Sequence, residues 1–293
     1  MDFKKGDRVI HKNAPAWGIG EIIELSGGPY CKIFFVNHGY TEISKDSLDF
    51  LKKIEGKDAV HPLLDNLRLP SQDNNLKFRS FGNLVSSFIK IFPQGFYDNE
   101  YIKHERTYKV EAHDMTADLL NEASLTDLIE IKQYSELCLK ALKVVNKTNL
   151  IFPNEKMALK DGLKSVEHQK IFSVALFDIL YGDDEMSKRF DHFANALEEI
   201  KAAKWTTQTY FLFLAFPEKY MFMKPSVTKY AADAFGFELY YRSEINWKSY
   251  ESLLCFSKYI SDELPKISDY LQPRDMIDVQ SFVWSSVPGK YTA

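Results

Sequence analysis

The segment 92–109 (FPQGFYDNEYIKHERTYK) gathers residue types that can bind a substrate and act on it. Asp98 and Glu105 supply carboxylates, and Arg106 can anchor a phosphate or orient a carboxylate. A Pro-Gln-Gly turn near its start predicts a loop, where binding residues concentrate. The spacing equally suits an exposed loop that enters a helix, with Glu105 and Lys109 paired one turn apart. The aromatic residues beside these groups are Phe96, Tyr97, Tyr101 and Tyr108.

A second acidic candidate is Glu155, in the segment 149–161 (NLIFPNEKMALKD). Asn154 is typical of a residue that caps a helix. Glu155 would then lie in the first turn, where the helix dipole favours an acid. The alternative is that Glu155 faces a cleft as a pocket residue.

Asp275 and Asp278 lie three residues apart in the segment 273–284 (PRDMIDVQSFVW), so both fall on one face of a predicted helix. Asp275 is placed to cap that helix. Asp278 falls within an apolar run and should pair with a cation, either Lys224 or Arg274. A paired acid would hold the Lys224 amine charged, whereas burial without one would lower its pKa towards nucleophilic use.

These candidates belong to a part of the chain that is predicted to be all helical. Apolar residues recur there at helical spacing, and Pro or Gly residues separate the segments. The polar, Pro-containing stretch 62–75 predicts a linker before it. The predicted helices cover 127–145, 155–166, 169–180, 188–200, 206–216, 226–235, 247–264 and 275–284.

The first 55 residues differ, because short β-type runs alternate with turn signals. Such short strands cannot form a two-layer sandwich, so we expect a small barrel, followed by a helical exit over 45–54. The predicted fold class is α+β multidomain, with a β-barrel over 1–55, a linker over 56–76 and an all-helical domain over 77–293. The predicted strands cover 8–11, 20–25, 31–36 and 40–43, with Val9, Ile22, Ile33 and Phe35 inside.

Composition narrows the class of protein. The chain has 293 residues and a formal net charge of −4, which excludes a polybasic binder, so DNA binding would need a local basic face. Cys31, Cys138 and Cys255 lie far apart, which argues against a disulfide framework or a zinc site and suits a reducing cytoplasm. No apolar run reaches about 18 residues, so we expect no membrane span. We also expect no cofactor.

The N-terminal residues resemble a known small-barrel module. The matching runs are FKKGDRVIH (3–11), GIGEI (18–22) and KIFF (32–35), followed by Gly39. They are similar to the Tudor-like, CarD-like module of helicases and transcription factors, over about 50 residues. The resemblance implies binding to nucleic acid or to a protein partner, or a docking module with no ligand of its own.

The stretch 200–237 (IKAAKWTTQTYFLFLAFPEKYMFMKPSVTKYAADAFGF) resembles the middle of a helix-hairpin-helix DNA glycosylase domain. In that superfamily a hairpin precedes a buried apolar helix, and a short loop leads to a catalytic Asp and an amphipathic helix. Here 206–216 would be the buried helix, 217–223 the loop and 227–235 the next helix. The resemblance implies an enzyme that flips out a modified base and cleaves its N-glycosidic bond. Anti-phage enzymes of this activity are known among glycosylases.

Two positions depart from the glycosylase pattern. The family's hairpin is rich in glycine because backbone amides must approach a DNA phosphate, whereas this chain has Ile-Lys-Ala-Ala-Lys-Trp over 200–205. Lys201 and Lys204 could supply those phosphate contacts as side chains. Lys224 stands where the family has its catalytic Asp.

The resemblance assigns roles to the candidates above. Cleavage builds positive charge on the sugar, which a carboxylate stabilises, or a lysine amine attacks the sugar and forms a Schiff base. The extruded base enters a pocket with aromatic walls, and the expected partner is double-stranded DNA with modified bases. The expected catalytic residues are Lys224, Asp98, Glu105, Glu155 and Asp278; the DNA contacts are Lys201, Lys204, Trp205, Arg106 and Lys109; and the base pocket is Phe96, Tyr97 and Tyr101.

Two other functions remain open from the sequence. A DNA- or protein-binding accessory factor of defence or transcription would need no catalytic Asp, which agrees with Lys224 at that position. A phosphodiester nuclease would need a divalent metal held by acids such as Asp98, Glu105 and Glu155.

Overall fold

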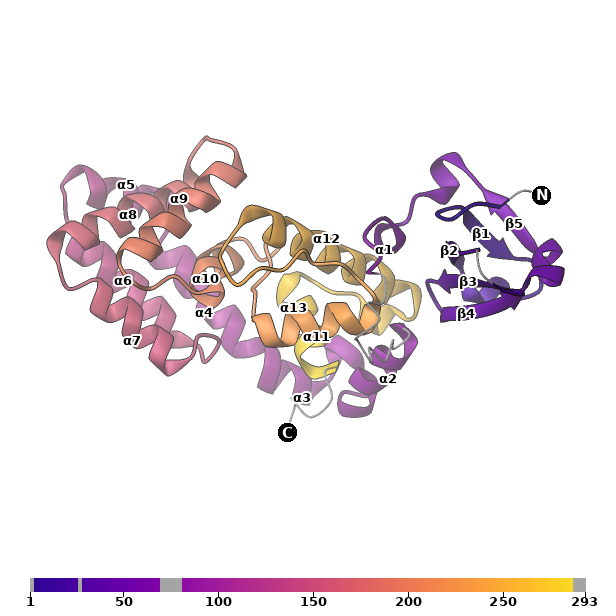
Figure 1. Ribbon diagram of the computed structural model, residues 1–293. Helices are drawn as coiled ribbons and strands as arrows, with labels where there is room; N and C mark the ends of the chain where they lie inside the picture. Colours follow the sequence, from indigo (N-terminus) through magenta and orange to yellow (C-terminus); the bar gives the residue numbers. More distant parts are fainter. Residues whose placement is uncertain (1–2, 26–27, 69–80, 287–293) are drawn as a thin grey trace. The chain divides into compact units, whose positions relative to one another are not determined.

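The structure is a computed structural model, and it describes residues 3–25, 28–68 and 81–286 (Figure 1). The chain forms two compact units. The first unit comprises Met1–Ile91, Lys229–Leu239 and Ser285–Ala293, and the second comprises Phe92–Thr228 and Tyr240–Trp284. Among the described residues, no helix combines the length and apolar character needed to cross a membrane.

The first unit begins with a five-stranded antiparallel sheet, in the order β4-β3-β2-β1-β5. Gly20 allows two strands to pack closely, because a Cβ at that position would lie 2.6 Å from the ring of Phe35. The four residues predicted to lie inside, Val9, Ile22, Ile33 and Phe35, are all fully buried, which confirms that expectation. The strands are β1 (Arg8–His11), β2 (Ile19–Glu24), β3 (Tyr30–Phe35), β4 (Gly39–Ser44) and β5 (Leu51–Ile54).

The predicted helical exit over 45–54 is only half right. Lys45–Phe50 forms a 3-10 helix, but Leu51–Ile54 is the strand β5. This strand pairs with β1, where Leu51 lies opposite His11. Pairing satisfies backbone groups that β1 would otherwise leave open, and it buries Leu51 in the core of the sheet. A tertiary contact therefore overrides the local helical pattern.

The first unit also contains helices and a backbone bridge between residues far apart in the sequence. A backbone bridge joins Leu67 to Phe237, and the amide of Arg68 donates to the carbonyl of Gly236 at 2.8 Å. Arg68 also forms an ion pair with Asp233. The helices of this region are α1 (Pro62–Asp65), α2 (Phe81–Ile91) and the part of α11 (Pro225–Phe235) from Lys229 onward. Of the linker expected over 56–76, residues 69–76 lie outside the described part of the chain.

The second unit is helical. At its centre, α10 (Trp205–Ala215) is buried along almost its whole length, including the polar residues of its first turns and the apolar run Tyr210–Leu214. The segments expected to be helical agree with the observed helices to within a few residues at most ends. The other helices are α3 (Asn99–Tyr101), α4 (Thr107–Leu119), α5 (Glu122–Glu130), α6 (Tyr134–Lys147), α7 (Pro153–Gly162), α8 (Val166–Tyr181), α9 (Met186–Glu199), α12 (Trp247–Glu263) and α13 (Met276–Ser286).

One predicted helix is wrong. The segment 127–145 belongs to two helices, α5 and α6, which are separated at Lys132. Lys132 has a φ of 59°, in the left-handed region that ends a helix. The amide of Gln133 then donates to the carbonyl of Leu128 at 2.8 Å, which closes the end of α5. Apolar spacing alone continues across this break and cannot reveal it.

Candidate functional site

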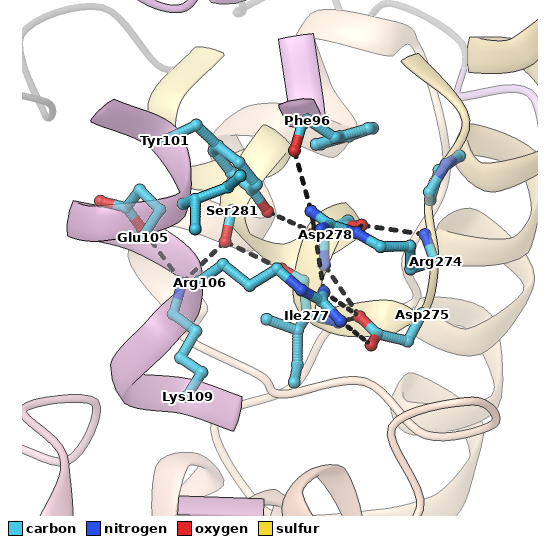
Figure 2. A network of polar contacts seen from close by, with 12 residues as sticks. Phe96, Tyr101, Glu105, Arg106, Lys109, Arg274, Asp275, Ile277, Asp278 and Ser281 are labelled. Atoms are coloured by element: carbon cyan, nitrogen blue, oxygen red, sulfur yellow. Dashed lines mark hydrogen bonds and ion pairs between the residues drawn. The ribbon is translucent and has the colours of Figure 1, made fainter. Parts of the chain in front are cut away.

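A network of buried charges joins the start of α4 to α13 (Figure 2). The buried carboxylate of Asp278 accepts hydrogen bonds from the Tyr101 hydroxyl at 2.5 Å, from Arg106 Nη1 at 2.8 Å and from Arg274 Nε at 2.8 Å. Arg106 Nη2 also donates to Asp275 Oδ2 at 2.6 Å. The sequence predicted that Asp278 pairs with either Lys224 or Arg274, and in the structure it pairs with Arg274.

Electrostatics shift the pKa values of two members of this network, Tyr101 and Arg106. Burial raises the pKa of Tyr101 well above its ordinary value, and the Asp278 carboxylate raises it further. Burial alone would lower the pKa of Arg106, but Asp275 and Asp278 outweigh it and raise that pKa. Tyr101 therefore stays protonated as a donor and Arg106 stays charged, so the network acts as a fixed support.

A π-helical turn, Ile102–Arg106, brings the residues of this network to one side. It runs between α3 and α4, and the carbonyl of Ile102 accepts from both the backbone amide and the hydroxyl of Thr107, the latter at 2.8 Å. Tyr101 before the turn and Arg106 at its end both reach Asp278 on α13 (Figure 2). Single π turns inside helices often occur at functional sites.

One turn further along, Lys109 is buried with no exposed surface. Its Nζ donates to Glu105 Oε2 at 3.0 Å and to Ser281 Oγ at 2.8 Å. Burial lowers the pKa of Lys109, and Glu105 opposes this shift. The sequence spacing predicted this pair of Glu105 with Lys109 on an exposed helix, whereas the structure shows the pair buried.

A pocket of about 130 Å³ lies beside Glu105 and Lys109 within the second unit. This is about ten times the volume that one water needs, so a small ring can be accommodated. The lining combines two amines, a carboxylate, two amides, an imidazole and aromatic rings. The lining residues are His104, Glu105, Tyr108, Lys109, Asn149, Leu150, Lys224, Gln280 and Trp284.

Lys224 reaches this pocket from the residue before α11, where its carbonyl accepts from the amide of Thr228 at 2.9 Å. Its Nζ lies 4.4 Å from the centroid of the Trp284 ring and 4.6 Å from that of Phe152. An ammonium group over aromatic faces is attracted by the ring quadrupoles. The two rings therefore fix the position of the Lys224 amine at the pocket.

Gln280 lines the pocket with a largely buried side chain. Its side chain is 6% exposed, and its Oε1 has no hydrogen-bond partner among the described residues. Buried polar atoms without a partner are rare, and each one calls for an explanation. This oxygen is therefore an unsatisfied acceptor on a residue that lines the pocket.

The loop residues expected to bind substrate have structural roles instead. Asp98 caps α3, because its side chain accepts from the amide of Glu100 at 2.9 Å and from that of Gln94 at 3.2 Å. Phe96 and Tyr101 are fully buried, so neither presents a face to a ligand. Tyr97 is 55% exposed, and its ring lies beside Arg274. The expected base pocket of these three rings is therefore not formed, and different residues line the pocket.

Glu155 also has a capping role. Its Oε2 accepts from the amide of Phe152 at 3.2 Å and from the Thr206 hydroxyl at 2.9 Å, which ties the start of α7 to the start of α10. Phe152 in turn contacts Lys224. Asp278 likewise lies in the buried network and not at the pocket surface.

The turn that leads into α10 carries the residues expected to contact DNA. Lys201, with a φ of 60°, and Lys204 are both exposed, and neither forms an ion pair with any residue that the structure describes. Trp205 is 4% exposed and its indole N–H donates to the carbonyl of Arg242 at 3.0 Å, so it packs inside the unit. Thr209, on the first turns of α10, accepts from the amide of Met223, which joins this helix to the segment before Lys224.

Sequence reasoning missed several residues of the pocket. Asn149 and Leu150 follow α6 and carried no motif of their own. A usable signal was present in the spacing, because three pairs of lining residues lie four residues apart and so share a helix face. These pairs are His104 with Tyr108, Glu105 with Lys109, and Gln280 with Trp284.

The acids that a nuclease would need are separated. Asp98 caps α3, Glu105 pairs with Lys109, and Glu155 caps α7. Within the described ranges, no group of three or more His, Cys, Asp or Glu residues is arranged to hold a metal ion.

Comparisons with protein-family models, with curated proteins and with solved structures found no match to this chain.

Proposed function

We propose that the chain is a DNA glycosylase whose base pocket is the one lined by Lys224, Glu105 and Trp284. The observation that carries the proposal is the Lys224 amine, held between two aromatic rings at a pocket that also contains a carboxylate. A flat base can stack on Trp284 or Tyr108, and Asn149 and Gln280 can hydrogen-bond its edge. The resemblance of 200–237 to helix-hairpin-helix glycosylases supports the same assignment.

Two routes for bond cleavage fit the residues of the pocket. In the first, Glu105 stabilises the positive charge that develops on the sugar while water attacks. In the second, a lysine amine attacks the anomeric carbon, the glycosidic C–N bond breaks, and the bonding electrons leave with the base, which takes up a proton. Lys224 and Lys109 are the two amines that line the pocket.

DNA would reach the pocket past the turn before α10. Lys201 and Lys204 are exposed there and can neutralise phosphates. The N-terminal residues, whose sequence resembles a Tudor-like module, would bind nucleic acid or a protein partner in addition.

The test is incubation with phage DNA that carries modified bases and with unmodified DNA, followed by alkali. New breaks in modified DNA alone support the proposal. Lys224→Met should abolish these breaks, whereas Lys219→Met is the matched control, because Lys219 also lies over a ring, that of Tyr220, but does not line the pocket. If neither DNA gains breaks, or if Lys224→Met and Glu105→Gln both keep full activity, the proposal is wrong.

Borohydride reduction separates the two routes. A Schiff base would be reduced to a stable protein–DNA adduct, which Lys224→Met or Lys109→Met should remove. Breaks without any adduct would assign the reaction to Glu105 and water.

A second candidate is a binding protein without chemistry. It is favoured by the mutual pairing of Glu105 with Lys109, which occupies the carboxylate. Binding to modified DNA without breaks under any condition would support this candidate.

A further inference from the structure

A groove lies between α6 and α7, on residues that the proposed glycosylase site does not use. It has a volume of about 610 Å³ and lies within the second unit. The residues that line it are Leu139, Leu142, Lys143 and Asn146 from α6, and Pro153, Lys156, Met157 and Lys160 from α7.

The floor of the groove is apolar and exposed. Leu139 is 65% exposed and Met157 is 58% exposed. The fold does not need either of them inside, since α6 buries Leu137, Ala141 and Val144 in the unit instead. Neighbouring apolar side chains with this much exposure mark an interaction surface, and the flexible Met side chain adapts to different partners.

The rim of the groove is positive. Three lysines and no acidic residue belong to its lining. Lys143 and Lys160 form no ion pair with any residue described in the structure, and Lys156 Nζ donates to the carbonyl of Thr148. A positive rim attracts a partner of opposite charge and fixes its register.

We propose that this groove docks an acidic amphipathic helix of a partner protein. Leucine-like anchors at i, i+3 or i+4 and i+7 would cover Leu139, Leu142 and Met157, and Glu or Asp residues beside them would face the lysines. DNA fits the rim but not the floor, because phosphate binding gains nothing from exposed Leu and Met side chains.

The test uses the full chain and fluorescently labelled helical peptides of about 15 residues, long enough for three anchors. One panel carries leucine anchors with glutamates flanking them on the same face of the helix. The matched panels replace glutamate by lysine, or leucine by serine. Fluorescence anisotropy should detect binding of the acidic leucine panel alone, and added salt should weaken it.

Variants of the groove locate the binding. Leu139→Asn combined with Met157→Asn should weaken binding about tenfold or more, as expected when central anchors lose their contacts. Ile131→Asn is the control, because Ile131 is equally exposed at 65% but lies outside the groove. Lys143→Glu combined with Lys160→Glu should weaken the acidic panel and favour the lysine panel.

Three results would overturn the proposal. The acidic panel could fail to bind, or it could bind the Leu139 and Met157 double variant as well as the unchanged chain. Duplex DNA could also bind in a way that depends on Lys143 and Lys160 but not on the two apolar residues, which would make the groove a nucleic-acid surface.

Discussion

At the scale of single residues, Asp278 is the position on which the buried network depends. Its carboxylate accepts hydrogen bonds from one hydroxyl and two guanidinium groups, and its side chain has no exposed surface. Removing one partner of a buried ion pair leaves the other charges without compensation in a medium of low polarity. The cost is therefore much larger than for the same change on the surface.

We expect Asp278→Asn to lower the free energy of unfolding by about 3–5 kcal/mol. Urea denaturation followed by circular dichroism measures it. The control is Asp262→Asn, since Asp262 pairs with Lys258 at an exposed site and the change there should cost less than about 1 kcal/mol. Equal effects of the two substitutions would contradict the role given to Asp278.

Lys109 gives the free energy of unfolding a dependence on pH. Burial lowers the pKa of Lys109 in the folded chain, so the unfolded chain binds more protons between this lowered value and the ordinary Lys pKa of about 10.4. Stability therefore rises with pH through this window and is lost as pH falls through it. Lys109→Met should remove the rise, although it leaves Glu105 without its partner and lowers stability throughout.

The measurement compares urea denaturation of the two chains from about pH 7 to just below pH 10. This range lies below the ordinary tyrosine pKa of about 10, above which the buried tyrosines also contribute. The difference in slope between the chains isolates Lys109. Identical slopes would show that the Glu105 carboxylate keeps the amine fully charged.

At the scale of elements, Glu155 links α7 to α10, a contact between two helices that the sequence did not predict. Its carboxylate accepts from the amide of Phe152 at the start of α7 and from Thr206 at the start of α10. Glu155→Ala should lower the free energy of unfolding by about 1–2 kcal/mol, whereas Glu155→Gln, which keeps an acceptor oxygen, should cost less.

Glu136 provides the control for this substitution. It lies in the first turn of α6, as Glu155 does in α7, so Glu136→Ala removes the favourable interaction with the helix dipole but no link to a second helix. The expected cost is about 0.3–1 kcal/mol. If Glu155→Ala costs no more than this, the link to α10 contributes nothing measurable.

The helices and strands also show how much of the fold the sequence could predict. Periodicity predicted most helices of the second unit, because a buried face leaves a regular apolar pattern. It failed at Lys132, where a single left-handed residue ends α5, and at Leu51–Ile54, where pairing with β1 decides the structure. The π-helical turn Ile102–Arg106 has no sequence signature of this kind, so the spacing predicted the pair of Glu105 with Lys109 but not the contacts of Tyr101 and Arg106 with Asp278.

The candidate site was predicted only in part, because residue type does not show which carboxylates reach the pocket. Glu105 and Lys109 were named from residue type and Lys224 from the glycosylase resemblance, and the structure brings all three to one pocket. Asp98 and Glu155 have the same chemistry in the sequence, yet each caps a helix. Capping and catalysis use the same carboxylates, and only the geometry distinguishes them.

At the scale of the whole molecule, the first compact unit is assembled from distant parts of the chain. Residues 66–68 lie beside residues 236–238, through the bridge of Leu67 with Phe237 and the hydrogen bond from the amide of Glu238 to the carbonyl of Asn66 at 2.7 Å. The ion pair of Arg68 with Asp233 reinforces this contact. The sheet and these residues belong to one unit, although the sequence suggested a boundary between them.

Two truncated chains test which residues complete this unit. A chain of residues 56–293 keeps 66–68, whereas a chain of residues 77–293 loses them and leaves the backbone groups of 236–238 without their partners. Unpaired backbone groups and the loss of the Arg68 ion pair expose this segment to water and to protease. We therefore expect the shorter chain to unfold at a lower temperature and to be cleaved faster within 229–239.

Both truncated chains lack the sheet, so a difference between them comes from residues 56–76, which include α1 and the contact at 66–68. Differential scanning calorimetry and mass spectrometry of the cleavage products give the two readouts. Arg68→Ala in the longer chain removes the side-chain pair but keeps the backbone bonds, so it should fall between the two in melting temperature. If all three chains melt and are cleaved alike, residues 66–68 do not support 229–239, and the stability of that segment must come from other contacts of α11.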